Sequence, residues 1–245
     1  MSLLDAFKDV LKHTGNLGFI EMVKVIGSST TTKIETKDAD NTVIIYGEMY
    51  QPIKDIQSTL GLSRLSLLKG YIGMHEGSDV TIVTEARNNV NIPTDMLFDN
   101  KDGMTANYRF MSESMINDQV KVPPFKGATW DVVVTPTKPS IAMLSENFGV
   151  IGSLEKRFIV SVVKGTLNFS IGSGPTDKVV VPFAKNVTGN LKHQWTYPLT
   201  QVLAILKLAD TAASCTISFS DQGALKIDID SGIGKYQYIL PAGKA

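Results

Sequence analysis

Few residues of this sequence have the types and spacing that catalysis or metal binding requires. The histidines His13, His75 and His193 lie far apart, and none belongs to a helical His-x-x-x-His pair or stands beside a cysteine pair. Asp228 and Asp230 share one face of an expected strand and could pair for general acid–base chemistry, but a solvated strand face is the simpler interpretation. We therefore expect no metal site and no carboxylate dyad.

The single cysteine and the most glycine-rich segment also lack the neighbours that chemistry would need. Cys215 lies in an apolar run without an activating partner beside it, so we interpret it as core filling rather than as a nucleophile. Residues 172–175 are followed by no helix and no Lys-Ser/Thr pair that would hold phosphate, which predicts a hairpin turn. The sequence predicts neither an enzyme nor a bound cofactor.

The composition predicts a folded, cytoplasmic chain. Of the 245 residues, 43% are hydrophobic and 20% charged, which is enough apolar material for one large or two modest cores. No segment approaches the roughly 18 consecutive apolar residues of a membrane-spanning helix, and the first residues do not have the pattern of a secretion signal. We expect no membrane partner.

The two halves carry opposite net charge although the whole chain is neutral. Residues 1–120 hold 11 Lys and Arg against 16 Asp and Glu, whereas residues 121–245 hold 13 against 8. Opposite halves would suit a head-to-tail contact of the kind that closes into rings, and chance drift of surface charge is the alternative explanation.

In the first half, apolar spacing predicts an amphipathic helix followed by a meander of strands. Ser2 can cap a helix that carries Leu3 and Phe7 on one stripe and stops near Gly15. A second, short helix is expected to begin at Pro52. The expected strands are residues 19–26, 31–37, 42–49, 66–72, 79–86 and 104–111.

The second half repeats this order. Helices are expected to begin at Lys138 and just after Pro198, each with an apolar stripe. The expected strands are residues 130–135, 158–163, 166–171, 179–187, 215–220, 224–230 and 235–240. Two similar halves of antiparallel sheets with two short helices each indicate an α+β fold that arose by duplication.

Between the halves the periodicity lapses. Pro123 and Pro124 exclude a central strand and favour an extended connector. The sequence therefore predicts a first domain of residues 1–118, a connector of residues 119–126 and a second domain of residues 127–245.

The order of elements, the length and several local runs resemble the two-domain DNA sliding clamps, the family that includes the T4-type phage clamp and eukaryotic proliferating cell nuclear antigen. The resemblance spans the chain and is most specific in residues 199–241, where an apolar helix with one lysine precedes a hairpin and a last strand ending at Pro241. The N-terminal helix that leads directly into a strand, and the connector containing residues 122–125, are similar to the phage members in particular.

This resemblance implies a DNA replication processivity factor without enzymatic activity. Three copies would form a homotrimer, a closed ring with helices lining the hole, which encircles duplex DNA regardless of sequence and binds a DNA polymerase and a clamp loader. Sliding requires diffuse attraction between lysines and phosphates without contacts to base edges. The candidate DNA-facing residues, each of which could also be an ordinary solvated lysine, are Lys8, Lys12, Lys54, Lys138 and Lys207.

The resemblance also implies an apolar patch beside the connector and the C-terminal tail that accepts a short peptide from polymerases. The matching residues are Val122, Pro123, Phe125, Leu240 and Pro241. Simple packing of the connector against the core is the other interpretation, and it is strongest for Phe125.

Two other classes of protein remain open. A β-rich virion or tail assembly protein would also be neutral, free of disulfides and oligomeric, but its helices would not need basic faces. A small-molecule-binding or hydrolytic β-protein would need a pocket with convergent polar groups, and the sequence offers no such cluster. A three-fold ring with lysines facing inward would select the clamp, which would act in the host cytoplasm if a phage encodes it.

Overall fold

The computed structural model describes residues 2–75, 79–87, 90–100, 103–153, 155–172 and 177–244. The chain divides into two units: unit 1 comprises Met1–Pro123 and Gly232–Tyr236, and unit 2 comprises Pro124–Ser231 and Gln237–Ala245. The chain therefore leaves unit 1 within its proline pair, returns to it briefly and ends in unit 2. Of the turn expected at residues 172–175, all but Gly172 lies outside the described residues.

The strands of unit 1 form two antiparallel sheets. The first has the order β4-β1-β2-β3, and the opening residues of β15 (Gly234–Pro241) continue it beside β3. The second has the order β5-β6-β7. The bounds are β1 Val23–Gly27, β2 Thr32–Lys37, β3 Ile44–Met49, β4 Thr59–Leu62, β5 Asp79–Arg87, β6 Val90–Asp99 and β7 Thr105–Arg109. Five of the expected strands are confirmed with shifted ends.

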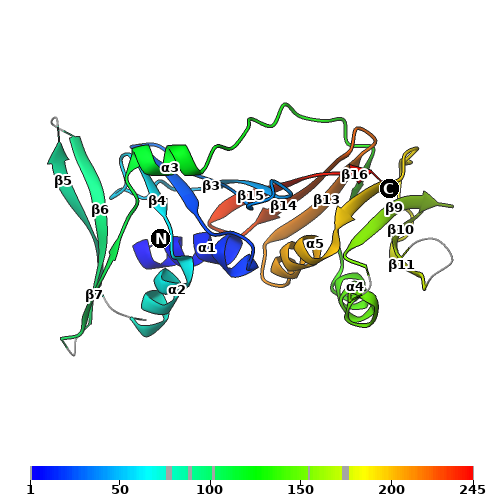
Figure 1. Ribbon diagram of the computed structural model, residues 1–245, viewed down its shortest axis with the longest axis horizontal. Helices are drawn as coiled ribbons and strands as arrows, with labels where there is room; N and C mark the ends of the chain where they lie inside the picture. Colours follow the sequence, from blue (N-terminus) through cyan, green and yellow to red (C-terminus); the bar gives the residue numbers. More distant parts are fainter. Residues whose placement is uncertain are drawn as a thin grey trace. The chain divides into compact units, whose positions relative to one another are not determined.

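Helix α1 (Leu3–His13) forms as the apolar spacing predicts. The Ser2 hydroxyl caps it by accepting a hydrogen bond from Asp5 N at 3.1 Å, and it donates to the Asp5 carboxylate at 2.6 Å. This second bond holds the pKa of Asp5 below its ordinary value. Phe7 and Leu11 are buried on the inner stripe of the helix. In Figure 1, α1 and α2 (Leu65–Met74) lie on one side of the strands of unit 1, with α3 (Glu113–Gln119) on the other.

The prediction of a helix beginning at Pro52 is wrong. This segment forms a turn in which Ile56 N donates to Ile53 O at 3.0 Å, and Ile53 N donates to the hydroxyl of Thr32 at 2.8 Å. Ile53 and Ile56 are both buried. An apolar pair three residues apart fits one turn of helix, but here the same spacing places two side chains in the core from a single turn.

The prediction of a strand at residues 66–72 is wrong as well, because this segment lies in helix α2. Leu65, Leu68 and Ile72 are buried at helical spacing, while Leu67 is exposed. The segment was expected as one more strand of the meander. The burial pattern shows that the spacing of three and four residues dominates.

Strands β4 and β6 and helix α3 of unit 1 were not predicted. Strand β6 contains Pro93, which lies where the register of β5 and β6 shifts, so the missing N–H is accommodated at an irregularity. Helix α3 follows Ser112, whose hydroxyl accepts from Met115 N at 3.5 Å. Its Ile116 is fully buried against Gly61 of β4.

Unit 2 also has two antiparallel sheets. One has the order β15-β14-β13-β8, and the other has the order β11-β10-β9-β12-β16. The bounds are β8 Val132–Val134, β9 Arg157–Val163, β10 Thr166–Ile171, β11 Val179–Ala184, β12 Trp195–Pro198, β13 Ser214–Ser220, β14 Ala224–Asp230 and β16 Gly243–Lys244. Strands β12 and β16 were not predicted; the other seven expected strands are confirmed.

The helices of unit 2 confirm both predictions. Helix α4 (Lys138–Ile151) begins with a reciprocal cap: the Thr137 hydroxyl accepts from Ser140 N at 3.2 Å, and the Ser140 hydroxyl accepts from Thr137 N at 3.0 Å. Helix α5 (Leu199–Leu206) follows Pro198 and continues as the 3₁₀ turn η2 (Lys207–Asp210). The described residues thus form a mixed α+β fold of antiparallel sheets with five helices.

Candidate nucleic-acid interface

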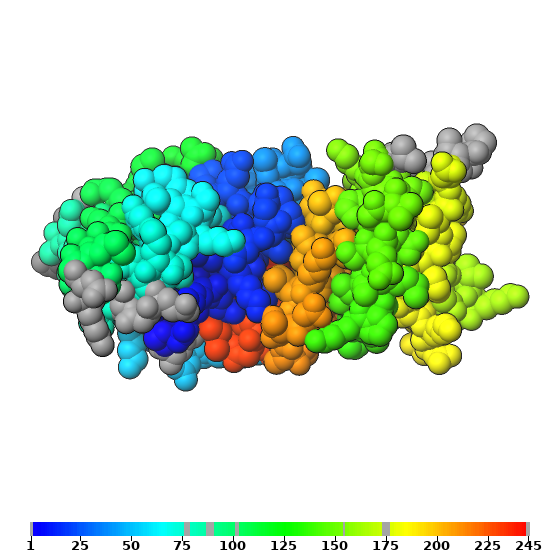
Figure 2. Space-filling view, turned by 90° about the horizontal axis from the view of Figure 1, so that it is seen from below, coloured from blue at the N-terminus to red at the C-terminus, as the bar shows by residue number. Residues whose placement is uncertain are grey.

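Each unit presents a pair of helices on one face of its strands. Figure 2 shows this face for each unit, with α1 and α2 in blue to cyan, and α4 and α5 in green and orange. Basic residues on these helices are the candidates for contact with a polyanion, because lysine attracts phosphate without demanding one geometry.

Helix α1 carries two of the predicted lysines. Lys8 and Lys12 lie on α1 and are half-buried, and each makes other contacts within the protein. The opposite stripe of α1 holds His13, whose ring stacks on Tyr236 with centroids 4.1 Å apart. Burial lowers the pKa of His13 to about 3, with a smaller contribution from Lys12, so this histidine adds no positive charge to the face at neutral pH.

Helix α2 adds two cations that sequence reasoning missed. Lys69 and Arg64 are exposed, the first within α2 and the second immediately before it. They were missed because the segment was interpreted as a strand. The helical spacing of Leu65, Leu68 and Ile72 was the signal that would have revealed them.

Lys54 does not lie on a helix, contrary to expectation. It is exposed in the turn after β3, where its carbonyl accepts from the side chain of Gln57 at 2.6 Å. The reason for including it among the DNA-facing residues, its place on a second helix, is therefore removed.

In unit 2 the predicted lysines lie at the ends of the helices. Lys138 begins α4, and its ammonium lies 3.8 Å from the Asp210 carboxylate and donates to the Asp210 carbonyl at 3.4 Å. Lys207 is exposed at the start of η2, the turn that ends at Asp210. Because the Lys138 and Asp210 side chains are 75% and 56% exposed, this ion pair is weak and leaves Lys138 accessible.

The residues expected to hold a partner peptide differ in accessibility. Pro241 and Pro123 are exposed, and Val122 and Phe125 are half-buried. Leu240 is fully buried, so the expectation that its side chain contributes to an open patch is wrong: it faces the core because the alternation of β15 points it inward. Val122 and Pro123 belong to unit 1, and the other three residues belong to unit 2.

Phe125 packs within unit 2. The centre of its ring lies 6.1 Å from the centre of the Trp130 ring. The Lys226 ammonium lies 5.1 Å from the centre of the Trp130 ring and forms an ion pair with Asp228 at 2.7 Å. This arrangement agrees with the packing interpretation of Phe125. It also accounts for Asp228, which accepts from Gln237 at 3.1 Å and pairs with a lysine rather than with Asp230.

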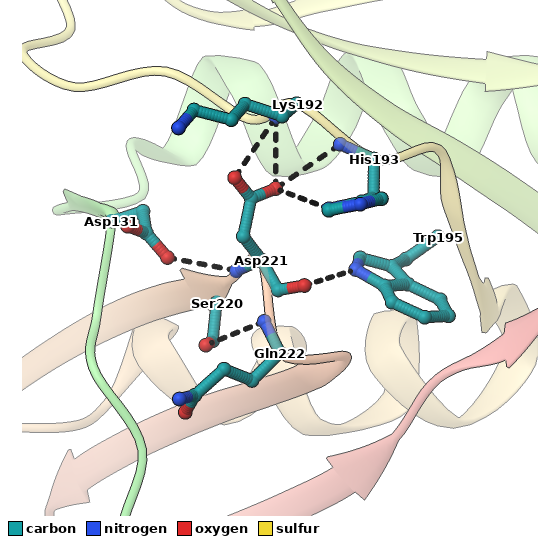
Figure 3. Close-up of polar contacts among 7 residues, drawn as sticks. All are labelled: Asp131, Lys192, His193, Trp195, Ser220, Asp221 and Gln222. Carbon is teal, nitrogen blue, oxygen red and sulfur yellow. Dashed lines mark hydrogen bonds and ion pairs between the residues drawn. The ribbon is translucent and has the colours of Figure 1, made fainter.

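The turn between β13 and β14 is fixed by an acidic residue (Figure 3). The Asp221 carboxylate accepts from Lys192 N at 2.8 Å and from His193 N at 3.2 Å. The Asp221 carbonyl accepts from the Trp195 indole at 2.9 Å, and Asp221 N donates to the Asp131 carboxylate at 2.8 Å. These bonds join the turn to the loop before β12 and to the residue before β8, which gives this network a structural role.

Within the described ranges, no group of three or more His, Cys, Asp or Glu side chains could hold a metal ion. Burial raises the pKa of the Cys215 thiol to about 12, so the thiolate that a nucleophile requires is not populated at neutral pH. No helix in the part of the chain that the structure describes is long and apolar enough to cross a membrane.

Comparison with known proteins identifies the fold. No protein-family model matches the sequence, and a search of curated proteins gives no match. Among solved structures, the chain is similar to the proliferating cellular nuclear antigen of Entamoeba histolytica, with a TM-score of 0.65 and 11% sequence identity, over 98% of this chain and 94% of that chain. The protein therefore has the fold of proliferating cell nuclear antigen. This likeness supports neither the phage subfamily nor the alternative of a virion component.

Proposed function

We propose that this protein is a DNA sliding clamp, which encircles duplex DNA and tethers a polymerase to it as a processivity factor. The observation that supports the proposal is the likeness to a proliferating cellular nuclear antigen over nearly the whole of both chains. In this proposal residues 1–118 and 127–245 are the two clamp domains, joined by the connector of residues 119–126, and the protein has no enzymatic activity.

Three copies joined head to tail would complete the ring. β5 and β7 end the second sheet of unit 1, and β11 ends one sheet of unit 2, so each unit has a strand edge that a neighbouring copy could pair. The excess of acidic residues in the first half and of basic residues in the second would favour that heterologous contact.

The basic helix faces would hold DNA by electrostatic attraction. In this proposal the DNA-facing set is the lysines that lie on the helices or at their ends: Lys8, Lys12, Lys69, Lys138 and Lys207. These residues can neutralise phosphates without reading bases, so the ring would remain free to move along the duplex.

The finer assignment to phage-type clamps rests on sequence alone. Its basis is the segment expected to form a helix that leads directly into a strand, and the short connector with two adjacent prolines. A clamp loader and a phage polymerase in the host cytoplasm would then be the partners.

Ring closure is the first test. Light scattering together with particle images of the purified protein is expected to give a trimer with an open centre. A protein that stays monomeric at every accessible concentration, or that grows into open fibres, would contradict the proposed assembly.

DNA retention tests the lysines. Replacing Lys8, Lys12 and Lys207 by alanine is expected to shorten retention on circular DNA and to lower the slope of log affinity against log salt by about 0.9 for each phosphate that is no longer neutralised. Lys54→Ala is the matched control, because Lys54 is exposed in unit 1 but lies on no helix. Equal retention by the triple variant and the control would remove these lysines from the interface.

The peptide site needs a test that spares the core. Pro241→Ala changes an exposed residue, whereas a charge at the fully buried Leu240 would unfold the strand. We expect Pro241→Ala to weaken binding of a C-terminal polymerase peptide and to leave the melting temperature unchanged. Normal peptide binding by this variant would exclude Pro241 from the site.

A further inference from the structure

A cavity of about 600 Å³ lies in unit 1, where the start of α2 meets the turn after α1 and the residues leading into β1. This volume is within the range of sites that hold small organic ligands. Polar side chains make up much of the lining: Asn16, Glu21, Ser63, Arg64, Ser66 and Lys69.

Contacts from β7 and the residue that ends it fix the backbone at the mouth of this cavity. Tyr108 accepts from Ser63 N at 2.9 Å, and its hydroxyl donates to the carbonyl of Ser63. Burial raises the pKa of Tyr108 to about 12, so the hydroxyl keeps its proton and can donate. The two bonds hold both polar groups of one residue, which sets where α2 begins.

Arg64 is held in place immediately after this anchor. Its backbone has φ 50° and ψ 48°, a left-handed conformation that is unfavourable for a long side chain. Its guanidinium donates to the Arg109 carbonyl at 3.2 Å and lies 5.5 Å from the centre of the Tyr108 ring. These contacts position one cation of the cavity before any ligand arrives.

The first turn of α2 has no side-chain cap. The Arg64 carbonyl accepts from Leu67 N and Leu68 N, and within the described part of the chain the N-cap residue Arg64 makes no side-chain capping bond to the helix. Since Leu65 and Ser66 line the cavity, the positive end of the helix dipole borders it.

The charges and donors along the lining favour an anion. Arg64 and Lys69 contribute two positive charges, against one carboxylate from Glu21. The hydroxyls of Ser63 and Ser66 add donors suited to phosphate oxygens. The volume leaves room for an organic group beside the phosphate.

We propose that this cavity binds the phosphate of an organic phosphate, supplied either by a free nucleotide or by a nucleic-acid backbone. Arg64 and Lys69 bind the phosphate oxygens, and the space beside Gly15 and Ile20 receives the attached group. The second source rests on the proposed clamp function, whereas the first does not.

Titration of the isotope-labelled full chain, followed by amide chemical shifts, tests the site. The probes are inorganic phosphate, adenosine monophosphate and a short linear duplex. We expect saturable shifts in residues 15–22 and 63–69, with affinity at least about tenfold weaker in Arg64→Asn/Lys69→Gln and unchanged in Lys54→Gln. Asparagine is chosen because it tolerates the left-handed conformation, and Lys69→Gln alone serves if the double variant does not fold.

The outcomes separate the two sources. Saturation by adenosine monophosphate but not by the duplex assigns the site to a free nucleotide, and saturation by the duplex, competed by the nucleotide, assigns it to the DNA backbone. No saturable shift with any probe, or full affinity in the folded variants, overturns the proposal. Retention of the ring on circular DNA is measured separately, so failure of the clamp function would not be mistaken for failure of this site.

Discussion

The helices of the two units are supported in different ways. In unit 2, α4 is capped by its own neighbours, Thr137 and Ser140. In unit 1, α2 begins where Tyr108, distant in sequence, holds Ser63, and α1, which Ser2 caps locally, ends at His13, whose ring stacks on the distant Tyr236. A helix with a local cap should keep its stability when distant residues are replaced. A helix that depends on distant buried contacts should lose stability when a buried histidine is protonated or a single buried hydroxyl is removed.

The largest expected effect is an acid sensitivity confined to unit 1. The pKa of His13 falls from 6.5 to about 3 on folding, so below pH 6.5 the unfolded chain binds a proton that the folded chain does not. The free energy of unfolding should therefore fall by about 1.4 kcal/mol per pH unit, or about 3 kcal/mol near pH 4. Hydrogen exchange in α1, measured across this range, reports the loss.

His13→Gln is the control for this prediction, because glutamine does not titrate. The variant should be less stable at neutral pH, since the stacked ring is lost. Its unfolding should take up one proton fewer than that of the wild type between about pH 4 and 6, so its free energy of unfolding should fall less steeply with decreasing pH. Equal pH slopes in wild type and variant would contradict the role of His13.

The second effect concerns the start of α2. Tyr108→Phe removes both bonds to Ser63 and should cost about 2 kcal/mol, because the backbone groups of Ser63 lose their partner. Tyr197→Phe in unit 2 is the matched control, since among the described residues the buried Tyr197 hydroxyl has no hydrogen-bond partner. That variant should be neutral or slightly stabilising in urea unfolding. Similar losses in both variants would refute the distinction.

The same difference explains how much of the fold was predictable. Helix α4 was predictable because the residues that cap it, its early proline and its apolar stripe all lie within one short segment of the sequence. The start of α2 was not predictable because Tyr108, distant in sequence, fixes where it begins and Arg64 provides no cap, although the helical spacing of its apolar residues was a local signal. Strand β6 was missed because Pro93 argues against a strand unless the irregular register beside it is known.

The candidate site was predictable to a similar extent. The positions of Lys8, Lys12, Lys138 and Lys207 on or beside helices were predictable because those helices have clear apolar stripes, whereas their contact with DNA stays a prediction. Lys69 was not among the predicted residues, because helix α2, on which it lies, was not predicted. Leu240 was included because the resemblance to sliding clamps implies an apolar patch beside the C-terminal tail, but the structure buries this side chain in the core.

The third effect tests the local support of α4. Thr137→Ala removes the acceptor for Ser140 N and should cost about 1 kcal/mol, while Thr137→Ser keeps the oxygen and should cost little. Both tryptophans, Trp130 and Trp195, belong to unit 2, so their fluorescence reports this unit during thermal unfolding. Unequal destabilisation of the two variants is the expected result; equal melting temperatures would show that the cap contributes nothing measurable.

The smallest effect compares the helix interiors directly. Gly70 in α2 and Gly149 in α4 have ordinary helical backbones, and an added Cβ would meet no atom within 4 Å at either position. Alanine should therefore stabilise the protein by about 0.5–1 kcal/mol at Gly70 and by less at Gly149, which lies in the last turn. Gly61→Ala is the contrast, since its Cβ would lie 2.8 Å from Ile116 and should destabilise. A loss of stability on Gly70→Ala would mean that other atoms pack against the exposed face of α2. The two helices would then differ in the packing of their outer faces as well as in how they begin.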